Sequence, residues 1–217
     1  MQRLPQRCAP QDIASYYRCI AELRVDNFGA TGARMMLRGL GIDDAPREFS
    51  DRVASKHPQF GAGFGSIDRP SQFKIHAFAE YSVMTSGGGS VNGSLLRESG
   101  LNIGFGLEAP RWLRAVRLPI NAHVERELCA EFQLLEALCE VLASASAVAG
   151  ASLDAARREQ TIGSVEMLIT GSSCASCLCA LRQFRLLWPN VTLAVGMLRA
   201  RAALPELRIG AGQADRS

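Results

Sequence analysis

Hydrophobic side chains recur at helical spacing in the stretch that follows Asn121. Asparagine is a residue type that caps helix N-termini well, and the apolar positions after it repeat every three or four residues. These positions are Leu128, Phe132, Leu135, Leu138 and Leu142. The pattern predicts a long amphipathic helix with one buried face.

Short apolar runs lie on both sides of this helix, and their composition and partial alternation predict strands. They cover residues 101–107, 112–118, 165–170 and 191–195. A second helix is expected over residues 174–187, whereas residues 73–84 fit either a strand or a short helix. Strands and helices that alternate in this order predict an α/β fold with at least one parallel crossover.

The chain divides into regions of different composition. Residues 1–57 are interpreted as a helical N-terminal extension, and residues 58–72 as a linker loop rich in glycine and proline. Residues 73–205 hold the alternating strands and helices, so we expect them to form the domain that carries the chemistry. The last residues, 206–217, are mostly small and charged and predict a flexible tail.

The overall composition is that of an ordinary globular protein. The chain has 217 residues, of which 47% are hydrophobic and 21% are charged, and its formal net charge is +3. A net charge this small does not by itself indicate a nucleic-acid partner. No apolar run approaches the roughly 20 residues that span a bilayer, and the first residues lack the apolar segment of a Sec signal. We therefore expect neither a membrane partner nor Sec-type export.

The chain has seven cysteines, an odd number, and three of them fall within six positions. This distribution favours thiolate chemistry over a disulfide framework. Cys174 and Cys177 form a Cys-x-x-Cys motif where a predicted strand turns into a helix, which brings both sulfurs to one side, within reach of a single ion. The N-terminus of a helix also stabilises thiolates.

A third cysteine on the neighbouring predicted helix can complete a metal site. Cys129 supplies this sulfur, and three protein ligands leave the fourth position of a tetrahedral ion open to water. Glu131 follows two residues later and can sit beside that water without binding the metal. The spacing therefore predicts a three-ligand site with a carboxylate next to its open position.

These two motifs resemble those of the zinc-dependent nucleic-acid and nucleotide (cytidine) deaminase superfamily. Residues 129–135, Cys-Ala-Glu-Phe-Gln-Leu-Leu, look like the His-Ala-Glu-x-Gln-Leu-Leu of several bacterial toxin-type and fungal branches. Residues 173–177, Ser-Cys-Ala-Ser-Cys, resemble the second motif of bacterial toxin or effector-type deaminases, as do residues 183–184 and 188–191 behind them. The resemblance covers roughly residues 100–197.

The resemblance implies both a fold and a mechanism. The fold is a three-layer α/β/α cytidine-deaminase-like sandwich with a mixed sheet, preceded by the helical extension. Cys129, Cys174 and Cys177 bind Zn²⁺, which lowers the pKa of the water in the fourth position. Glu131 passes the proton of this water to the ring and then to the leaving amine, so that cytosine at C4, or adenine at C6, loses ammonia.

The resemblance also implies partners and a location. The substrate is a nucleic acid or a nucleoside, and an immunity or inhibitor protein is an expected partner. The protein is expected in the cytoplasm or in a target cell that it reaches through a specialised secretion system. Two residues depart from the family pattern: Ser173 stands where many members have proline, and Cys129 stands where histidine is commoner.

A second assignment of the first motif stays open. His123 and Glu125 also form a His-x-Glu pair, nearer the expected start of the helix, but no Gln-Leu-Leu pattern follows them. Asn102 and Asn121 are candidate contacts to the base. Three thiolates and a divalent ion carry a formal charge of −1, so we expect a compensating cation, for which Arg182 is the candidate.

Two other functions fit the same residues. The cysteines could stabilise a non-catalytic zinc-bound interaction module in which Glu131 has no chemical role. A Cys-x-x-Cys after a strand also suits a thiol redox protein, although the Ala-Ser pair between these cysteines differs from the Gly-Pro type typical there. The metal content and the effect of Glu131→Ala separate these hypotheses.

Overall fold

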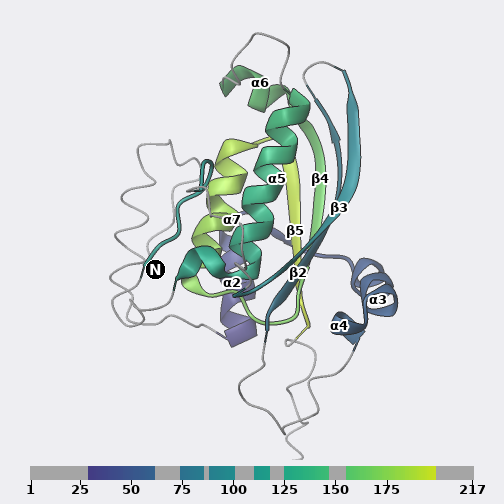
Figure 1. Cartoon of the computed structure of the whole chain (residues 1–217), viewed down its shortest axis with the longest axis vertical. Helices are drawn as coiled ribbons and strands as arrows, with labels where there is room; N and C mark the ends of the chain where they lie inside the picture. Colours follow the sequence, from purple (N-terminus) through teal and green to yellow (C-terminus); the bar gives the residue numbers. More distant parts are fainter. Residues whose placement is uncertain are drawn as a thin grey trace, which may run out of the picture.

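A mixed sheet of five strands lies at the centre of the computed structural model (Figure 1). The structure describes residues 29–61, 74–85, 88–100, 110–117, 125–146 and 155–198. The strands are β1 (Asp43–Asp44), β2 (His76–Met84), β3 (Ser90–Glu98), β4 (Ile162–Ile169) and β5 (Val191–Met197). Their order is β1-β5-β4-β2-β3; β1, β5 and β4 run parallel, and β2 is antiparallel to both of its neighbours. The predicted α/β class is confirmed.

The first two long strands form a hairpin. Every residue of β2 pairs with β3, from His76 opposite Glu98 to Met84 opposite Ser90. Gly88, with φ +76°, lies between the two strands, in a backbone conformation that favours glycine. Residues 76–84 are thus a strand and not a short helix, whereas the predicted strand over residues 101–107 lies outside the described residues.

The predicted parallel crossover is formed by β4, α7 (Ala175–Leu187) and β5. In β5 the alternate residues Val191, Leu193 and Val195 are buried, while Thr192 between them is exposed. This alternation is what a strand requires when one face packs on a core. β4 ends at Ile169, so the crossover places the Cys-x-x-Cys motif beyond the carboxyl end of this strand, at the start of α7.

Helices lie on both faces of the sheet (Figure 1). On one face, α2 (Gly29–Gly39), α5 (Ala130–Ser146) and α7 share the main hydrophobic core with the strands, where Ala79, Leu138 and Leu178 are fully buried. On the other face, Phe49 of α3 (Arg47–Lys56) packs with Phe60 of α4 (Pro58–Gly61) and with the strands. The remaining helices are η4 (Arg126–Leu128), a 3-10 turn, and α6 (Ala155–Gln160).

The described part of residues 1–57 packs into the same core as the sheet. Leu37 and Ile42 are buried among residues of α5, α7 and the strands, and the two residues of β1 pair with Ala194 and Val195 of β5. This segment therefore contributes a strand as well as helices. The domain limits at residues 57, 72 and 205 remain predictions, and the tail over residues 206–217 lies outside the described residues.

The predicted strand over residues 112–118 is wrong in its described part, because residues 111–117 form an irregular segment. Its buried apolar residues, Leu113 and Val116, are three positions apart and do not follow the two-residue period of a strand. Helix side chains replace strand partners: the Glu136 carboxylate accepts hydrogen bonds at 2.6–3.0 Å from three successive N–H groups. These belong to Arg111, Trp112 and Leu113.

The long amphipathic helix is present, but α5 begins at Ala130, later than predicted. Its apolar face is buried as the spacing indicates, at Phe132, Leu135, Leu138 and Leu142. The proposed cap, Asn121, lies outside the described residues. The turn η4 stands in front of α5 instead, and this arrangement sets the position of Cys129 between the two.

Candidate metal centre

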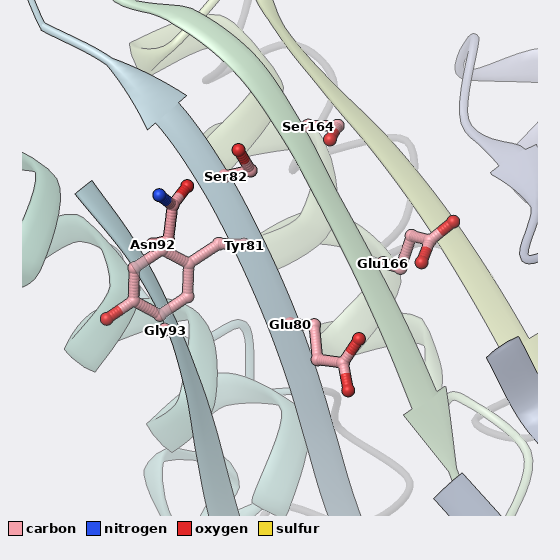
Figure 2. Close-up of a pocket in the computed structure, with 7 residues that line it drawn as sticks. All are labelled: Glu80, Tyr81, Ser82, Asn92, Gly93, Ser164 and Glu166. Carbon is pink, nitrogen blue, oxygen red and sulfur yellow. The ribbon is translucent and has the colours of Figure 1, made fainter. Parts of the chain in front are cut away.

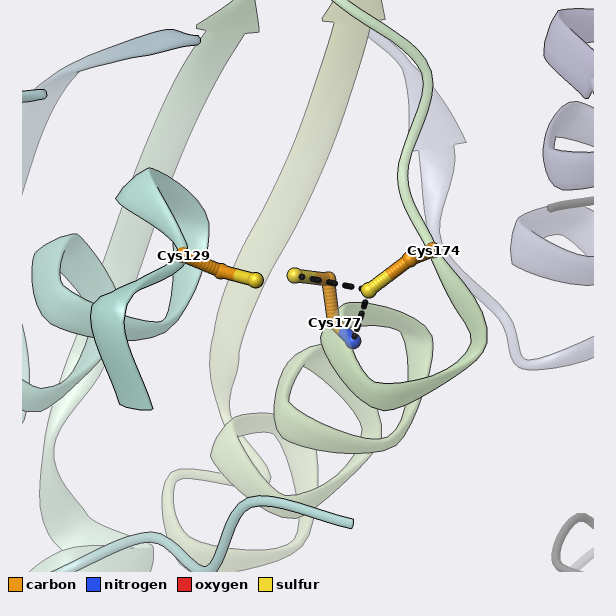
Figure 3. A group of neighbouring side chains, drawn as sticks. All are labelled: Cys129, Cys174 and Cys177. Carbon is orange, nitrogen blue, oxygen red and sulfur yellow. Dashed lines mark hydrogen bonds between the residues drawn. The ribbon is translucent and has the colours of Figure 1, made fainter. Parts of the chain in front are cut away.

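The N-terminus of α7 holds two of the three candidate ligands. Cys174 is the N-cap residue, with extended backbone angles (φ −78°, ψ 169°), and its sulfur accepts a hydrogen bond from the N–H of Cys177 at 3.5 Å. The two sulfur atoms are themselves 3.5 Å apart (Figure 3). A cap followed by one helical turn thus brings both sulfurs together, as the sequence predicts.

The third sulfur comes from the residue between η4 and α5. Cys129 donates its backbone N–H to the carbonyl of Arg126 at 3.1 Å, which closes the 3-10 turn, and its own carbonyl accepts the N–H of Gln133 at 3.1 Å as α5 begins. Cys129 is therefore the last residue before the helix rather than a residue within it. Its sulfur faces those of Cys174 and Cys177 (Figure 3), and all three lie within 4.8 Å of one another.

The three sulfurs of the cluster share their negative charge unequally. Hydrogen bonds from the thiols of Cys129 and Cys177 lower the pKa of Cys174 far below its usual range, and the positive charge of Arg126 acts in the same direction. The same contacts with Cys174 raise the pKa of Cys129, and those with both other cysteines raise the pKa of Cys177. The thiolate is therefore held by Cys174, at the N-terminus of α7, where the helix dipole favours an anion.

Glu131 lies beside the cluster, in the first turn of α5, and is 4% exposed. Burial raises the pKa of its carboxyl group to about 7, and the negative charge of Cys174 adds to the rise. A hydrogen bond from the Cys177 thiol and the charge of Arg126 act in the opposite direction. A carboxyl group with this pKa can both accept and give up a proton near neutral pH.

The cation next to the cluster is Arg126, not Arg182. Arg126 is 7% exposed, and its charge lowers the pKa of both Cys174 and Glu131. Arg182 instead donates a hydrogen bond to the carbonyl of Leu40 at 3.4 Å, next to α2. Arg126 was not predicted as a site residue, although its position three residues before Cys129 is visible in the sequence.

The irregular segment over residues 111–117 links the two ligand-bearing elements. Ser176, between the two cysteines of α7, accepts the N–H of Val116 at 3.0 Å. The next residue, Arg117, forms an ion pair of 3.6 Å with Glu127 in η4. The segment therefore bridges the start of α7 and the turn that carries Cys129. Sequence reasoning did not identify this part of the site, because its contacts join residues far apart along the chain.

The other cysteines of the described chain are not part of the cluster. Cys139 and Cys179 are buried to 0% and 1% exposure among hydrophobic residues. Burial raises the pKa of Cys179 to about 12 and raises that of Cys139 as well. Both therefore serve as small apolar side chains.

The alternative first motif is described only in part. Glu125 is exposed and precedes η4, outside the buried cluster. His123 lies outside the described residues, as do the two candidate base contacts, Asn102 and Asn121. Among the described residues, the cysteine cluster is the one group of histidine, cysteine or acidic side chains whose ligand atoms converge closely enough to hold an ion.

A second concavity lies on the sheet face opposite α5 and α7 (Figure 2), with a volume of about 270 Å³. It is lined by Glu80, Tyr81, Ser82, Asn92, Gly93, Ser164 and Glu166. Arg52 of α3 forms ion pairs with both carboxylates, at 2.5 Å to Glu80 and 3.9 Å to Glu166. The residues that line this concavity include no cysteine or histidine, and so none of the candidate ligands.

Comparisons with known protein families, with curated proteins and with solved structures found no match to this chain. None of the helices in the described part of the chain combines the length and the apolar character needed to cross a membrane. The assignment of a function therefore depends on the geometry of the cysteine cluster and on the sequence motifs around it.

Proposed function

We propose that this protein is a zinc-dependent hydrolytic deaminase that acts on a cytosine-type base, with nucleic acid as the substrate class and a toxin or effector role. The observation that carries the proposal is the convergence of three sulfurs from two elements within 4.8 Å, next to a buried carboxylate. The motifs around Cys129 and Cys174, which resemble those of the deaminase superfamily, supply the choice of reaction.

The donor set fits zinc. Thiolate ligands favour soft or borderline ions such as Zn²⁺ over Mg²⁺ or Ca²⁺. Zn–S bonds of about 2.3 Å in a tetrahedral arrangement separate two sulfurs by about 3.8 Å. The sulfurs of Cys174 and Cys177 are 3.5 Å apart, and that of Cys129 lies within 4.8 Å of both, so small side-chain adjustments suffice.

The number of ligands also favours a catalytic site over a structural one. Structural zinc sites are closed by four protein ligands, whereas catalytic sites use three and keep one position for water or substrate. Within the part of the chain that the structure describes, the cluster has three ligand residues, and the Glu131 carboxylate next to it is not one of them. This count supports an enzyme rather than an interaction module.

Each residue has a role in the proposed reaction. Cys129, Cys174 and Cys177 would hold the ion, and a bound zinc ion supplies the Lewis acidity that activates water at neutral pH. Glu131 would take a proton from the attacking water, deliver it to the ring nitrogen and then protonate the departing amine. Its burial keeps bulk water from competing for this proton.

The function is tested by measuring metal content and ammonia release together. Purified protein is incubated with single-stranded and double-stranded DNA, with RNA and with free cytidine, and products are followed by sequencing and by ammonia assay. We expect about one zinc per chain and conversion of cytosine to uracil in at least one substrate. Zinc binding without deamination of any of these substrates, or deamination by metal-free protein, would contradict the proposal.

Two matched variants locate the proton carrier. Glu131→Gln keeps the shape of the side chain and is expected to lower turnover by about 10²- to 10⁴-fold, the usual contribution of a general acid–base group, while zinc stays bound. Glu125→Gln changes the exposed carboxylate of the alternative motif and should leave turnover within about twofold of the parent, as for a surface substitution. The reverse result would assign the reaction to the His123–Glu125 motif.

A further inference from the structure

The sulfurs of Cys174 and Cys177 are in direct contact. They are 3.5 Å apart across a single turn at the start of α7, and the backbone N–H of Cys177 holds the sulfur of Cys174 in place (Figure 3). Cys174 is half-buried and Cys177 is buried, so a small reagent reaches Cys174 more readily than Cys177. A reactive thiol backed by a second one is the usual arrangement of an oxidisable dithiol.

We propose that Cys174 and Cys177 form a reversible oxidation site whose disulfide prevents metal binding, so that a peroxide controls whether the centre can be loaded. This inference rests on the proposed metal centre, since it concerns two of the three ligands. The disulfide would remove two thiolates at once and leave Cys129 as the one sulfur of the described cluster, and one ligand is too few for a stable zinc site.

The oxidation is a two-step reaction with hydrogen peroxide as the oxidant. The sulfur of Cys174 attacks one peroxide oxygen, the O–O bond breaks and hydroxide leaves. Cys174 is then a sulfenic acid. The sulfur of Cys177 then attacks the sulfur of Cys174, the S–O bond breaks and water leaves. In total, two thiols lose two electrons and two protons, and one peroxide becomes two water molecules.

The geometry favours this pair over the other three thiols among the described residues. Cys129 lies within the 4.8 Å group but belongs to a separate element, so a disulfide with it would tie the start of α5 to α7. Cys139 and Cys179 are buried among apolar side chains, where a peroxide has little access. Cys174 and Cys177 lie within one helical turn and their sulfurs are already 3.5 Å apart, so their disulfide forms within a single element.

Tryptic peptides distinguish the candidate disulfides. Cleavage after Arg158 and Arg182 places Cys174, Cys177 and Cys179 in one peptide, while cleavage after Arg126 and Arg157 places Cys129 in another. The metal-free, reduced full-length protein is treated with hydrogen peroxide, blocked with an alkylating reagent and analysed by mass spectrometry. We expect peptide 159–182 to be lighter by two hydrogen atoms, with one cysteine, Cys179, alkylated after denaturation.

Variants and metal uptake complete the test. Cys177→Ser should abolish the internal disulfide, while Cys179→Ser and Cys129→Ser should retain it. Zinc uptake should fall from about one ion per chain to nearly none after oxidation, and a phosphine reductant should restore it. A cross-link between peptides 127–157 and 159–182, or full zinc uptake after oxidation, would overturn the inference. If the reduced protein binds no zinc, the proposed metal centre is refuted instead. The mass of peptide 159–182 still shows whether peroxide joins Cys174 and Cys177, because that measurement does not depend on zinc.

Discussion

The side-chain amide of Gln183 pairs with both backbone groups of Arg114. Its oxygen accepts the N–H of Arg114 at 2.9 Å, and its nitrogen donates to the carbonyl of the same residue, also at 2.9 Å. Gln183 is 7% exposed, and both of these bonds are partly buried. Gln183 on α7 therefore bonds the backbone of the irregular segment as a neighbouring strand would in a sheet. It holds in place the segment that passes Ser176 and the metal centre.

Replacing this glutamine should destabilise the fold. Gln183→Ala removes both partly buried hydrogen bonds to the backbone of Arg114, and at about 0.5–1.5 kcal/mol each their joint loss costs about 1–3 kcal/mol. We expect the free energy of unfolding in urea to fall by an amount in this range, and hydrogen exchange at the Arg114 amide to become faster. Thr192→Ala removes an exposed hydroxyl bonded to Gly163 and serves as the control, with a change within about 0.5 kcal/mol. Equal effects of the two substitutions would show that Gln183 does not anchor the segment.

Gly163 is required by the close approach of β4 to β2. A Cβ atom at this position would lie 2.2 Å from the carbonyl oxygen of Ser82 and 2.7 Å from the Cα of Val83, both backbone atoms that cannot move aside alone. Gly163→Ala should therefore lower the free energy of unfolding by about 1–3 kcal/mol or more. Gly39→Ala at the end of α2 meets no atom within 4 Å and should be neutral or stabilising by up to about 1 kcal/mol. Denaturant unfolding of both variants tests this contrast.

The buried thiol of Cys139 should make stability depend on pH in the alkaline range. Burial raises the pKa of this thiol above its ordinary value of 9.0. Above that pH the unfolded chain loses the proton while the native protein keeps it, so the unfolded state is favoured as the pH rises. The contribution of Cys139 is complete below pH 9 and is lost by up to about 1.4 kcal/mol per pH unit above it, until the raised pKa is reached.

Cys139→Ala isolates this contribution from those of other groups that titrate in the same range. We expect the difference in unfolding free energy between parent and variant to be constant from pH 7 to 8.5. Between pH 9 and 10 the parent should lose stability relative to Cys139→Ala, as measured by urea titration at each pH. A difference that stays constant over the whole range would mean that the native thiol ionises normally.

Local patterns predicted those parts of the fold that depend on local contacts. The Cys-x-x-Cys motif lies at the junction of β4 and α7, as predicted. Its two sulfurs come together because Cys174 caps the helix and Cys177 lies in the first turn, which are local features of the chain. The apolar face of α5 and the parallel crossover follow from side-chain periodicity in the same way. The convergence of Cys129 with this motif was predicted from spacing and motif resemblance together.

The parts that could not be predicted depend on contacts between distant residues. The segment over residues 111–117 is fixed by Glu136 and Gln183, which a strand pattern does not reveal. The pairing of β1 with β5 joins Asp43 and Ala194, across most of the chain, and two residues are too few to show a periodicity. Arg126 was missed because the burial of a charged side chain is decided by the tertiary fold and not by its neighbours in the sequence.

Arg126 should strengthen metal binding by balancing the charge of the cluster. Three thiolates and one divalent ion have a net charge of −1, and the buried guanidinium lies close enough to lower the pKa of Cys174. Removal of a buried charge from a group of opposite charge costs about 2–5 kcal/mol, and each 1.4 kcal/mol is about a factor of ten in affinity. We therefore expect Arg126→Gln to weaken zinc binding at least about tenfold in competition with a chelator.

Acidification gives an independent reading of the same effect. Without the cation, protonation of the thiols becomes easier and competes more strongly with the metal, so Arg126→Gln should release its zinc at a higher pH than the parent protein. Arg126→Lys keeps the charge and should restore much of the affinity. Arg182→Gln is the matched control, because Arg182 bonds to the carbonyl of Leu40, and its affinity and release pH should remain those of the parent. If Arg182→Gln releases zinc earlier and Arg126→Gln does not, the charge of the cluster is balanced from α7 and not by Arg126.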